Sequence, residues 1–170
     1  MPINQSTLRE YSSVRVAQKT VTEAARAGSL TAFLSHSHKD ATLAKGVQAY
    51  LNRMGWDVYI DWEDHSMPER PNRVTADKIR RKIVELDLFL LLATAISITS
   101  RWCPWELGYA DGRKDNSSIL VIQTRDDYGT IHGNEYLELY KHIDNESTGG
   151  IGAFDQTGYG IKLMGSVRPR

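Results

Sequence analysis

The stretch from Leu86 to Ala93 is apolar apart from Asp87 and forms the longest apolar run in the chain. A strand that is apolar on both faces is typical of the centre of a parallel sheet, where helices cover both sides. The run is far too short to cross a bilayer as a helix. We therefore expect a fold built around a buried central strand, with no membrane partner.

Short apolar strands and helical patterns alternate on both sides of this run. The predicted elements are a strand over residues 30–35, a helix over 44–54 that ends at Gly55, a strand over 57–61, a helix over 74–84, the central strand, a helix from about residue 104 and a strand over 118–123. Strands and helices that alternate at this spacing form an open, mostly parallel sheet with helices on both faces. The predicted fold class is α/β.

The two ends of the chain carry other patterns. Residues 6–27 mix apolar and charged positions and precede Gly28, which predicts an amphipathic helix with a glycine stop. We expect residues 1–28 to form a helical extension docked on one domain over residues 29–170, with self-association as the alternative role. Residues 135–143 fit either a helix or a last strand, and the glycine-rich residues 149–165 predict irregular turns.

A glutamate stands near the start of the helix that follows the central strand. Proline suits the first turn of a helix because its missing N–H is not needed there, so Pro104 marks the helix start and puts Glu106 in the first turn. The helix dipole favours an ionised carboxylate at that position. Trp102, four residues earlier, lies near it on the same helical face. An indole and a carboxylate are thus presented together.

Three segments converge on one edge of the predicted sheet. Ligands of such sheets bind outside the carboxyl ends of the strands, and the loop after Ser35, the loop after Asp61 and the helix that carries Glu106 all begin there. In the first loop, Ser37 and Asp40 stand three residues apart, as in a capping box. We expect the three segments to share one cleft.

Composition limits the possible partners. The chain has 170 residues with 21 basic and 21 acidic side chains, and it lacks a basic block with interleaved aromatics, so we expect no nucleic-acid partner. Cys103 is the only cysteine, which excludes an intrachain disulfide. The beginning of the sequence lacks the apolar core of a signal peptide. The expected location is cytoplasmic.

Two other kinds of site lack the partner residues that they require. His36 and His38 could form a metal pair, but no third ligand stands at a recognisable spacing, so we expect no metal and solvated loop histidines. Cys103 could be a nucleophile with a histidine, but the sequence specifies no partner for it. A buried, unreactive thiol is the expected state of Cys103.

The segments 31–40, 57–61 and 102–106 resemble a TIR domain in their order and spacing. The resemblance covers residues 31–123, leaves residues 124–170 outside it, and is closest to bacterial TIR proteins of the Thoeris anti-phage type. It implies a flavodoxin-like sheet. It also implies cleavage of the nicotinamide–ribose bond of NAD, often with cyclisation of the ADP-ribose part into a signal for a separate effector protein. NAD is then the substrate, and we expect no cofactor.

The resemblance implies a set of site residues as well. These are the catalytic Glu106 and the substrate-binding Phe33, Ser35, Ser37, Asp40 and Trp102. The reaction leaves an oxocarbenium-like ribose, which an ionised carboxylate stabilises. Aromatic faces favour the cationic pyridinium ring, and backbone N–H groups after Ser37 could hold the pyrophosphate. Residues 62–72 match the loop that the family uses in self-association and in gating the site.

Two other functions are considered beside this one. A TIR interaction module without turnover would act through residues 62–72 and the leader helix, although such a module has no need of an acid at Glu106. The other alternative is a nucleoside deoxyribosyltransferase, which has a similar sheet and also uses a glutamate but attacks a different N-glycoside. Hydrolysis and cyclisation of NAD are both compatible with the sequence.

Overall fold

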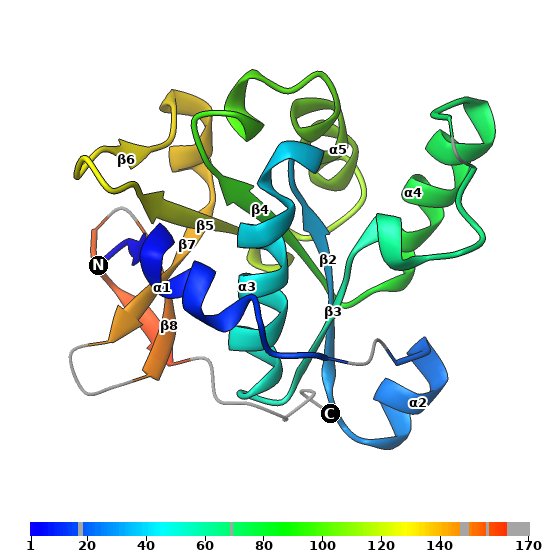
Figure 1. The fold of residues 1–170 in the computed structure, drawn as a ribbon, viewed down its shortest axis with the longest axis horizontal. Coiled ribbons are helices and arrows are strands. Elements are labelled where there is room, and N and C mark those ends of the chain that lie inside the picture. Colours follow the sequence, from blue (N-terminus) through cyan, green and yellow to red (C-terminus); the bar gives the residue numbers. More distant parts are fainter. Residues whose placement is uncertain (17–18, 69, 147–149, 156, 163–170) are drawn as a thin grey trace.

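The structure is a computed structural model that describes residues 1–16, 19–68, 70–146, 150–155 and 157–162. Its centre is one sheet with the strand order β3-β2-β4-β5-β7-β8-β9 (Figure 1). The strands are β2 (Leu30–Ser35), β3 (Trp56–Tyr59), β4 (Leu88–Ala93), β5 (Ile119–Arg125), β7 (Lys141–Glu146), β8 (Gly150–Phe154) and β9 (Gly160–Lys162). The pairs from β3 to β7 are parallel, whereas β8 and β9 pair antiparallel, so the expected mostly parallel sheet is confirmed.

The central strand β4 is buried on both faces. Successive side chains of a strand point to opposite sides of the sheet, and Leu90 and Leu92 enter one core while Phe89 and Leu91 enter the other. Each of these side chains is at most 2% exposed. Burial on both faces explains why this segment is apolar at nearly every position.

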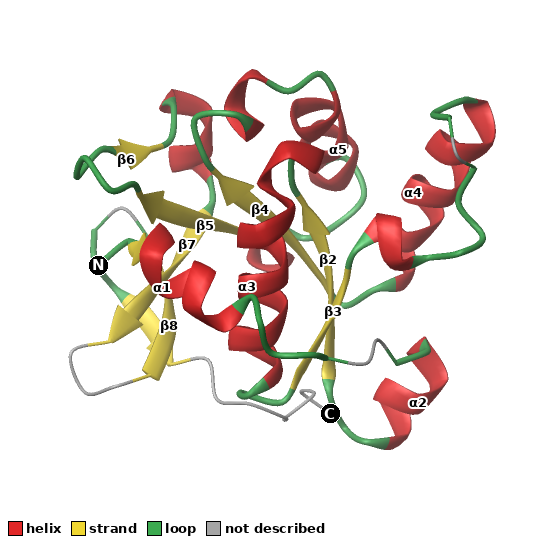
Figure 2. Cartoon of the chain, viewed as in Figure 1, coloured by secondary structure: helices red, strands yellow, loops and turns green. Residues whose placement is uncertain are grey.

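Helices cover both faces of the sheet (Figure 2). The helices α1 (Gln5–Tyr11) and α3 (Ala41–Asn52) cover one face, and α4 (Arg73–Glu85) and α5 (Trp102–Asp111) cover the other. Their buried contacts include Leu8 of α1, Val47 and Leu51 of α3, Ile79 and Ile83 of α4, and Leu107 and Ala110 of α5. This arrangement confirms the flavodoxin-like architecture.

The predicted single helix over residues 6–27 is wrong. The segment contains two short helices, α1 and α2 (Val21–Arg26). The hydroxyl of Ser12 donates a hydrogen bond to the carbonyl oxygen of Arg9, and such local side-chain bonds compete with helix continuation. The glycine stop is confirmed, because Gly28 has a φ of 68°.

The N-terminal segment is packed directly on the domain. The strand β1 (Ile3–Asn4) pairs in parallel with β5. The helix α1 lies so close to α3 that a Cβ atom added at Gly46 would stand 2.0 Å from the carbonyl oxygen of Leu8. Glycine at position 46 is therefore what allows the two helix backbones to approach.

The C-terminal part is more regular than its sequence predicts. Residues 135–143 divide between a 3-10 helix over Glu135–Leu139 and the start of β7. Within residues 149–165, which we expected to be irregular, most described positions form β8 and β9, and a turn that includes Thr157 and Gly158, the latter with a φ of 78°, lies between them. Residues 149, 156 and 163–165 lie outside the described part of the chain. Glycines carry no side chain, so they hid the alternating pattern that identifies a strand.

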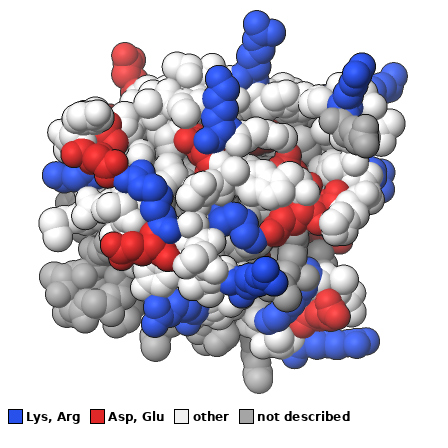
Figure 3. Space-filling view, in the orientation of Figure 1, with Lys and Arg blue, Asp and Glu red and all other residues white. Residues whose placement is uncertain are grey.

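The surface shows no separation of charge on the face seen in Figure 3, where Lys and Arg are interspersed with Asp and Glu. Among the described residues, no helix combines the length and the apolar character needed to span a membrane.

Candidate active site

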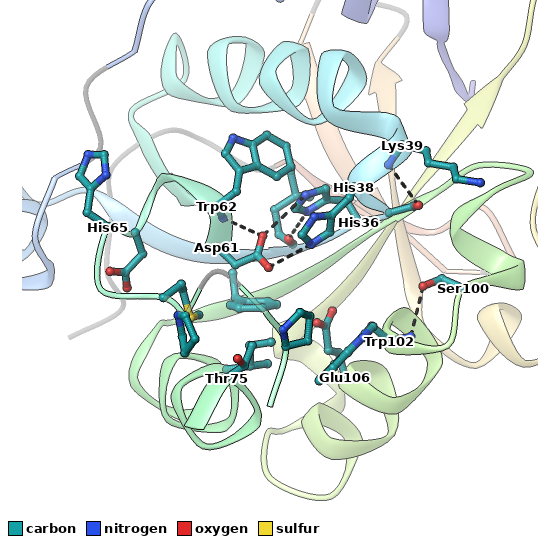
Figure 4. A pocket seen from close by; sticks show the side chains of 18 residues that line it. His36, His38, Lys39, Asp61, Trp62, His65, Thr75, Ser100, Trp102 and Glu106 are labelled. Atoms are coloured by element: carbon teal, nitrogen blue, oxygen red, sulfur yellow. Dashed lines mark hydrogen bonds and ion pairs between the residues drawn. The ribbon is translucent and has the colours of Figure 1, made fainter. Parts of the chain in front are cut away.

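A cavity of about 600 Å³ opens at the carboxyl edge of the parallel strands (Figure 4). The three segments expected to share a cleft all line it. The loop after β2 contributes His36, Ser37, His38 and Lys39, the stretch after β3 contributes Asp61, Trp62, Asp64, His65, Met67, Pro68 and Pro71, and α5 contributes Trp102 and Glu106. Phe33 of β2 also borders the cavity.

Glu106 is the fifth residue of α5 and lies outside its first turn, contrary to the sequence prediction. The helix begins at Trp102, two residues before Pro104. The hydroxyl oxygen of Ser100 accepts hydrogen bonds from the N–H groups of Trp102 and Cys103, at 3.2 and 3.5 Å, and so caps this earlier start. Glu106 lies on the buried face of α5, together with Cys103, Leu107 and Ala110.

Burial changes the acidity of Glu106. Its side chain is only 5% exposed, and this burial raises the pKa of Glu106 to about 7, while a 2.5 Å hydrogen bond from the Ser35 hydroxyl to Oε2 opposes the rise. The expected dipole-favoured ionisation is therefore wrong for the free protein. Near neutral pH the carboxyl group is therefore only partly ionised, and a cation bound beside it would favour the ionised form.

Both predicted aromatic residues border the cavity, but in different surroundings. Phe33 is 1% exposed and lies between the rings of Tyr59 and Phe89, with centroids 5.8 Å away on either side. Trp102 is 37% exposed and contacts Trp105 edge to face at 5.4 Å. Trp102 is thus the more accessible stacking surface, and Phe33 is mainly a core residue with one edge on the cavity.

The polar residues of the first loop separate into three positions. Ser37 lines the cavity, Ser35 lies behind Glu106, and Asp40 is not among the lining residues. The predicted capping box is wrong, because Asp40 accepts a 2.6 Å hydrogen bond from the Thr94 hydroxyl. The N–H groups of Lys39 and Asp40 already donate to the side chain and the carbonyl oxygen of Ser37. They are therefore not free to hold a pyrophosphate in this conformation.

Sequence reasoning missed a cluster around Asp61. Asp61 Oδ1 accepts a 3.0 Å hydrogen bond from the Trp62 N–H, and the Nε2 atoms of His36 and His38 lie 3.8 and 3.6 Å from its oxygens. His36 is 6% exposed, so the expectation of a solvated histidine is wrong at this position. Asp61 closely follows a parallel strand at the ligand-binding edge, and that position was the available signal.

Cys103 has the surroundings of an unreactive thiol. Its side chain is 1% exposed, and burial raises the pKa of Cys103 to about 11. A thiol of that acidity is a weak nucleophile at neutral pH. Across the described residues, no group of three or more His, Cys, Asp or Glu side chains is arranged to hold a metal ion.

Comparison with known proteins identifies the family. The sequence pattern of the TIR domain matches residues 32–151. The chain belongs to the TIR domain family. The matched range contains the three segments that meet at the cavity.

Two relatives are similar to this TIR domain. Over 113 residues the chain is 34% identical to a probable 3′ cyclic ADP-D-ribose synthase, ThsB′, of Bacillus cereus strain MSX-D12. The aligned region covers 65% of this chain and 58% of the relative. Over 98 residues it is 26% identical to a candidate cyclic ADP-D-ribose synthase, TIR2, of Cytobacillus dafuensis. This aligned region covers 56% of this chain and 25% of that protein. The chain thus matches just over half of the first relative and a quarter of the second. The resemblance to Thoeris-type TIR proteins is confirmed.

The cavity of this TIR domain combines charges of both signs. Carboxylates line it at Asp61, Asp64 and Glu106, and the loop after β2 adds His38 and Lys39. The contact with Asp61 raises the pKa of His38. Such a cavity can hold a molecule that carries a cationic ring at one end and anionic groups at the other.

Proposed function

We propose that this TIR protein cleaves the nicotinamide–ribose bond of NAD and converts the remainder into a cyclic ADP-ribose. The observation that carries the proposal is the buried Glu106 carboxyl group, which Ser35 holds by a hydrogen bond at a cavity that Trp102 also lines. The two relatives, named as a probable and a candidate cyclic ADP-D-ribose synthase, support the same reaction.

The chemistry follows from the charge on the substrate. Nicotinamide departs neutral from a cationic ring, so positive charge moves onto the ribose as the bond breaks, much as in glycoside hydrolysis. An ionised Glu106 beside the ribose stabilises that charge. The Ser35 hydroxyl fixes Oε2 and leaves the other oxygen for the ribose, and the partly exposed Trp102 offers a face for stacking on a base.

Cyclisation requires that an atom of the same molecule reach the ribose before water does. A folded dinucleotide in a cavity that excludes water meets this condition. We propose that the product is a signal for a separate effector protein in anti-phage defence, and that the protein self-associates through its TIR surfaces, including residues 62–72. The resemblance to Thoeris-type proteins supports both statements.

The direct test is an analysis of products. Purified protein is incubated with NAD, and the nucleosides are separated by retention and mass, with Glu106→Gln as the matched control. We expect free nicotinamide and a product one water lighter than linear ADP-ribose, and neither from the variant. Linear ADP-ribose as the only nucleotide product would show that the protein is a glycohydrolase and not a cyclase. An assembled wild type that releases no nicotinamide would favour the interaction module.

A further inference from the structure

Asp61 lies on the cavity wall away from the helix that carries Glu106. Figure 4 shows Asp61 with His36 and His38 on one side of the cavity, and Glu106 with Trp102 on the other. The Asp61 side chain is 18% exposed. The two carboxyl groups are close enough to interact across the cavity. Burial is the main cause of the raised pKa of Glu106, and the charge of Asp61 raises it further.

The position of Asp61 is fixed from behind. Its Oδ1 accepts the Trp62 N–H at 3.0 Å and stands 3.8 Å from His36 Nε2. The His36 side chain is 2% exposed, its Nδ1 donates a 2.9 Å hydrogen bond to the Leu34 carbonyl oxygen, and its ring packs against Trp62 with centroids 4.4 Å apart. The Trp62 N–H and the buried His36 ring beside it thus limit the positions that the Asp61 carboxylate can take.

The histidines leave much of the negative charge of Asp61 uncancelled. The Nδ1 proton of His36 is used by Leu34, so Nε2 carries a proton only in the cationic ring, and burial lowers the pKa of His36. His38 is 3.6 Å away on a side chain that is 73% exposed, where water screens the pair. Burial alone would raise the pKa of Asp61, but the contact with His38 and the hydrogen bond from the Trp62 N–H hold it below its usual range.

We propose that Asp61 contacts the substrate and makes the site prefer the oxidised dinucleotide, whose nicotinamide ring is cationic, over the reduced one, whose ring is neutral. This inference rests on the proposed function. A fixed carboxylate attracts a charge that is already present when the substrate binds, whereas Glu106 acts on charge that develops on the ribose. Asp61 therefore determines mainly KM and Glu106 mainly kcat.

The test compares binding of NAD and NADH by calorimetry, with the full chain carrying Glu106→Gln so that the substrate is not consumed. Asp61→Asn is then added, because asparagine keeps the size of the side chain and an oxygen for the Trp62 N–H. We expect the Kd for NAD to rise about tenfold and the Kd for NADH to change by less than about twofold. The matched control is Asp57→Asn, a buried carboxyl group on β3 that does not line this cavity, and it should change neither Kd.

A second readout uses the otherwise wild-type enzyme. Asp61→Asn should raise KM with little change in kcat, and it should move the acid limb of the pH profile to lower pH, because a charge that raises the pKa of Glu106 is removed. Equal losses for NAD and NADH, or no loss for either, would overturn the proposal. If the protein releases nicotinamide but Asp61→Asn does not change the preference for NAD over NADH, only the role of Asp61 is rejected. If the protein neither binds NAD nor releases nicotinamide, the proposed function is rejected as well.

Discussion

The hydroxyl of Ser35 donates a 2.5 Å hydrogen bond to Oε2 of Glu106, which joins the end of β2 to α5 across 71 positions of sequence. Ser35 is 1% exposed, so water does not compete for this bond. A hydrogen bond to a buried carboxylate is stronger than one between neutral groups. The bond orients the carboxyl group and holds the pKa of Glu106 below the value that burial alone would give.

Ser35→Ala should therefore raise the pKa of Glu106 and reduce the ionised fraction at neutral pH. We expect kcat/KM at pH 7 to fall about tenfold or more, as for the loss of a hydrogen bond to a charged group, and the acid limb of the pH profile to move to higher pH. Ser37→Ala is the matched control for the pH profile, because Ser37 lines the cavity without a hydrogen bond to Glu106, and it should leave the acid limb unchanged. An unchanged acid limb in Ser35→Ala would contradict this account of the bond.

Glu106→Gln should make the folded protein more stable above neutral pH. The pKa of Glu106 is about 7 in the folded chain against an ordinary value of 4.5, so the folded state binds more protons between these values and stability falls as pH rises through that window. Glutamine removes this loss, which amounts to about 3 kcal/mol at pH 8. Thermal unfolding should give a higher Tm for the variant at pH 8 and nearly equal values at pH 4. A difference of the same size at both values of pH would show that ionisation is not its cause.

Trp102→Ala should weaken substrate binding. Its ring is 37% exposed and borders the cavity, so its loss removes a stacking surface, and we expect KM for NAD to rise about fivefold. Tyr128→Ala, which removes an aromatic ring that is 95% exposed and outside the lining residues, should leave KM nearly unchanged. Steady-state kinetics of both variants checks this, and equal effects on KM would argue against stacking by Trp102.

Gly46→Ala should disturb the docking of the N-terminal helix. The added Cβ atom would stand 2.0 Å from the Leu8 carbonyl oxygen, so α1 must move away from α3. We expect a loss of about 1 to 3 kcal/mol in the free energy of unfolding, together with faster proteolysis near the N-terminus. Gly108→Ala in α5, where a Cβ atom meets nothing within 4 Å, should be neutral or stabilising. A Gly46→Ala protein as stable as wild type would show that the close contact is not required.

The sheet and its helices were predictable because their signals are local. Continuous apolar runs mark β2 and β4, and Gly28 and Gly55, which have positive φ in the structure, mark the ends of helical patterns. The shared cleft was predictable as well, because parallel strands place their carboxyl ends at one edge.

The details of the site depended on interactions between distant segments. Pro104 indicated the helix start only to within two residues, and the buried position of Glu106 depends on the packing of α5 beside Ser35 of β2. The role of Asp40 could not be foreseen, because its partner Thr94 stands 54 residues later. Asp61 was overlooked because only the packing of His36 beneath it shows that its carboxylate is held in place.

The rate of nicotinamide release from NAD by wild-type protein and by Glu106→Gln, measured side by side at pH 8, tests the central claim most directly. The carboxylate is largely ionised at that pH, and glutamine keeps the shape of the side chain and the hydrogen bond from Ser35 but not the charge. We predict at least a hundredfold lower rate for the variant, on the scale of losing one transition-state-stabilising group, with the variant folded by circular dichroism. A variant that releases nicotinamide at the wild-type rate would contradict the account.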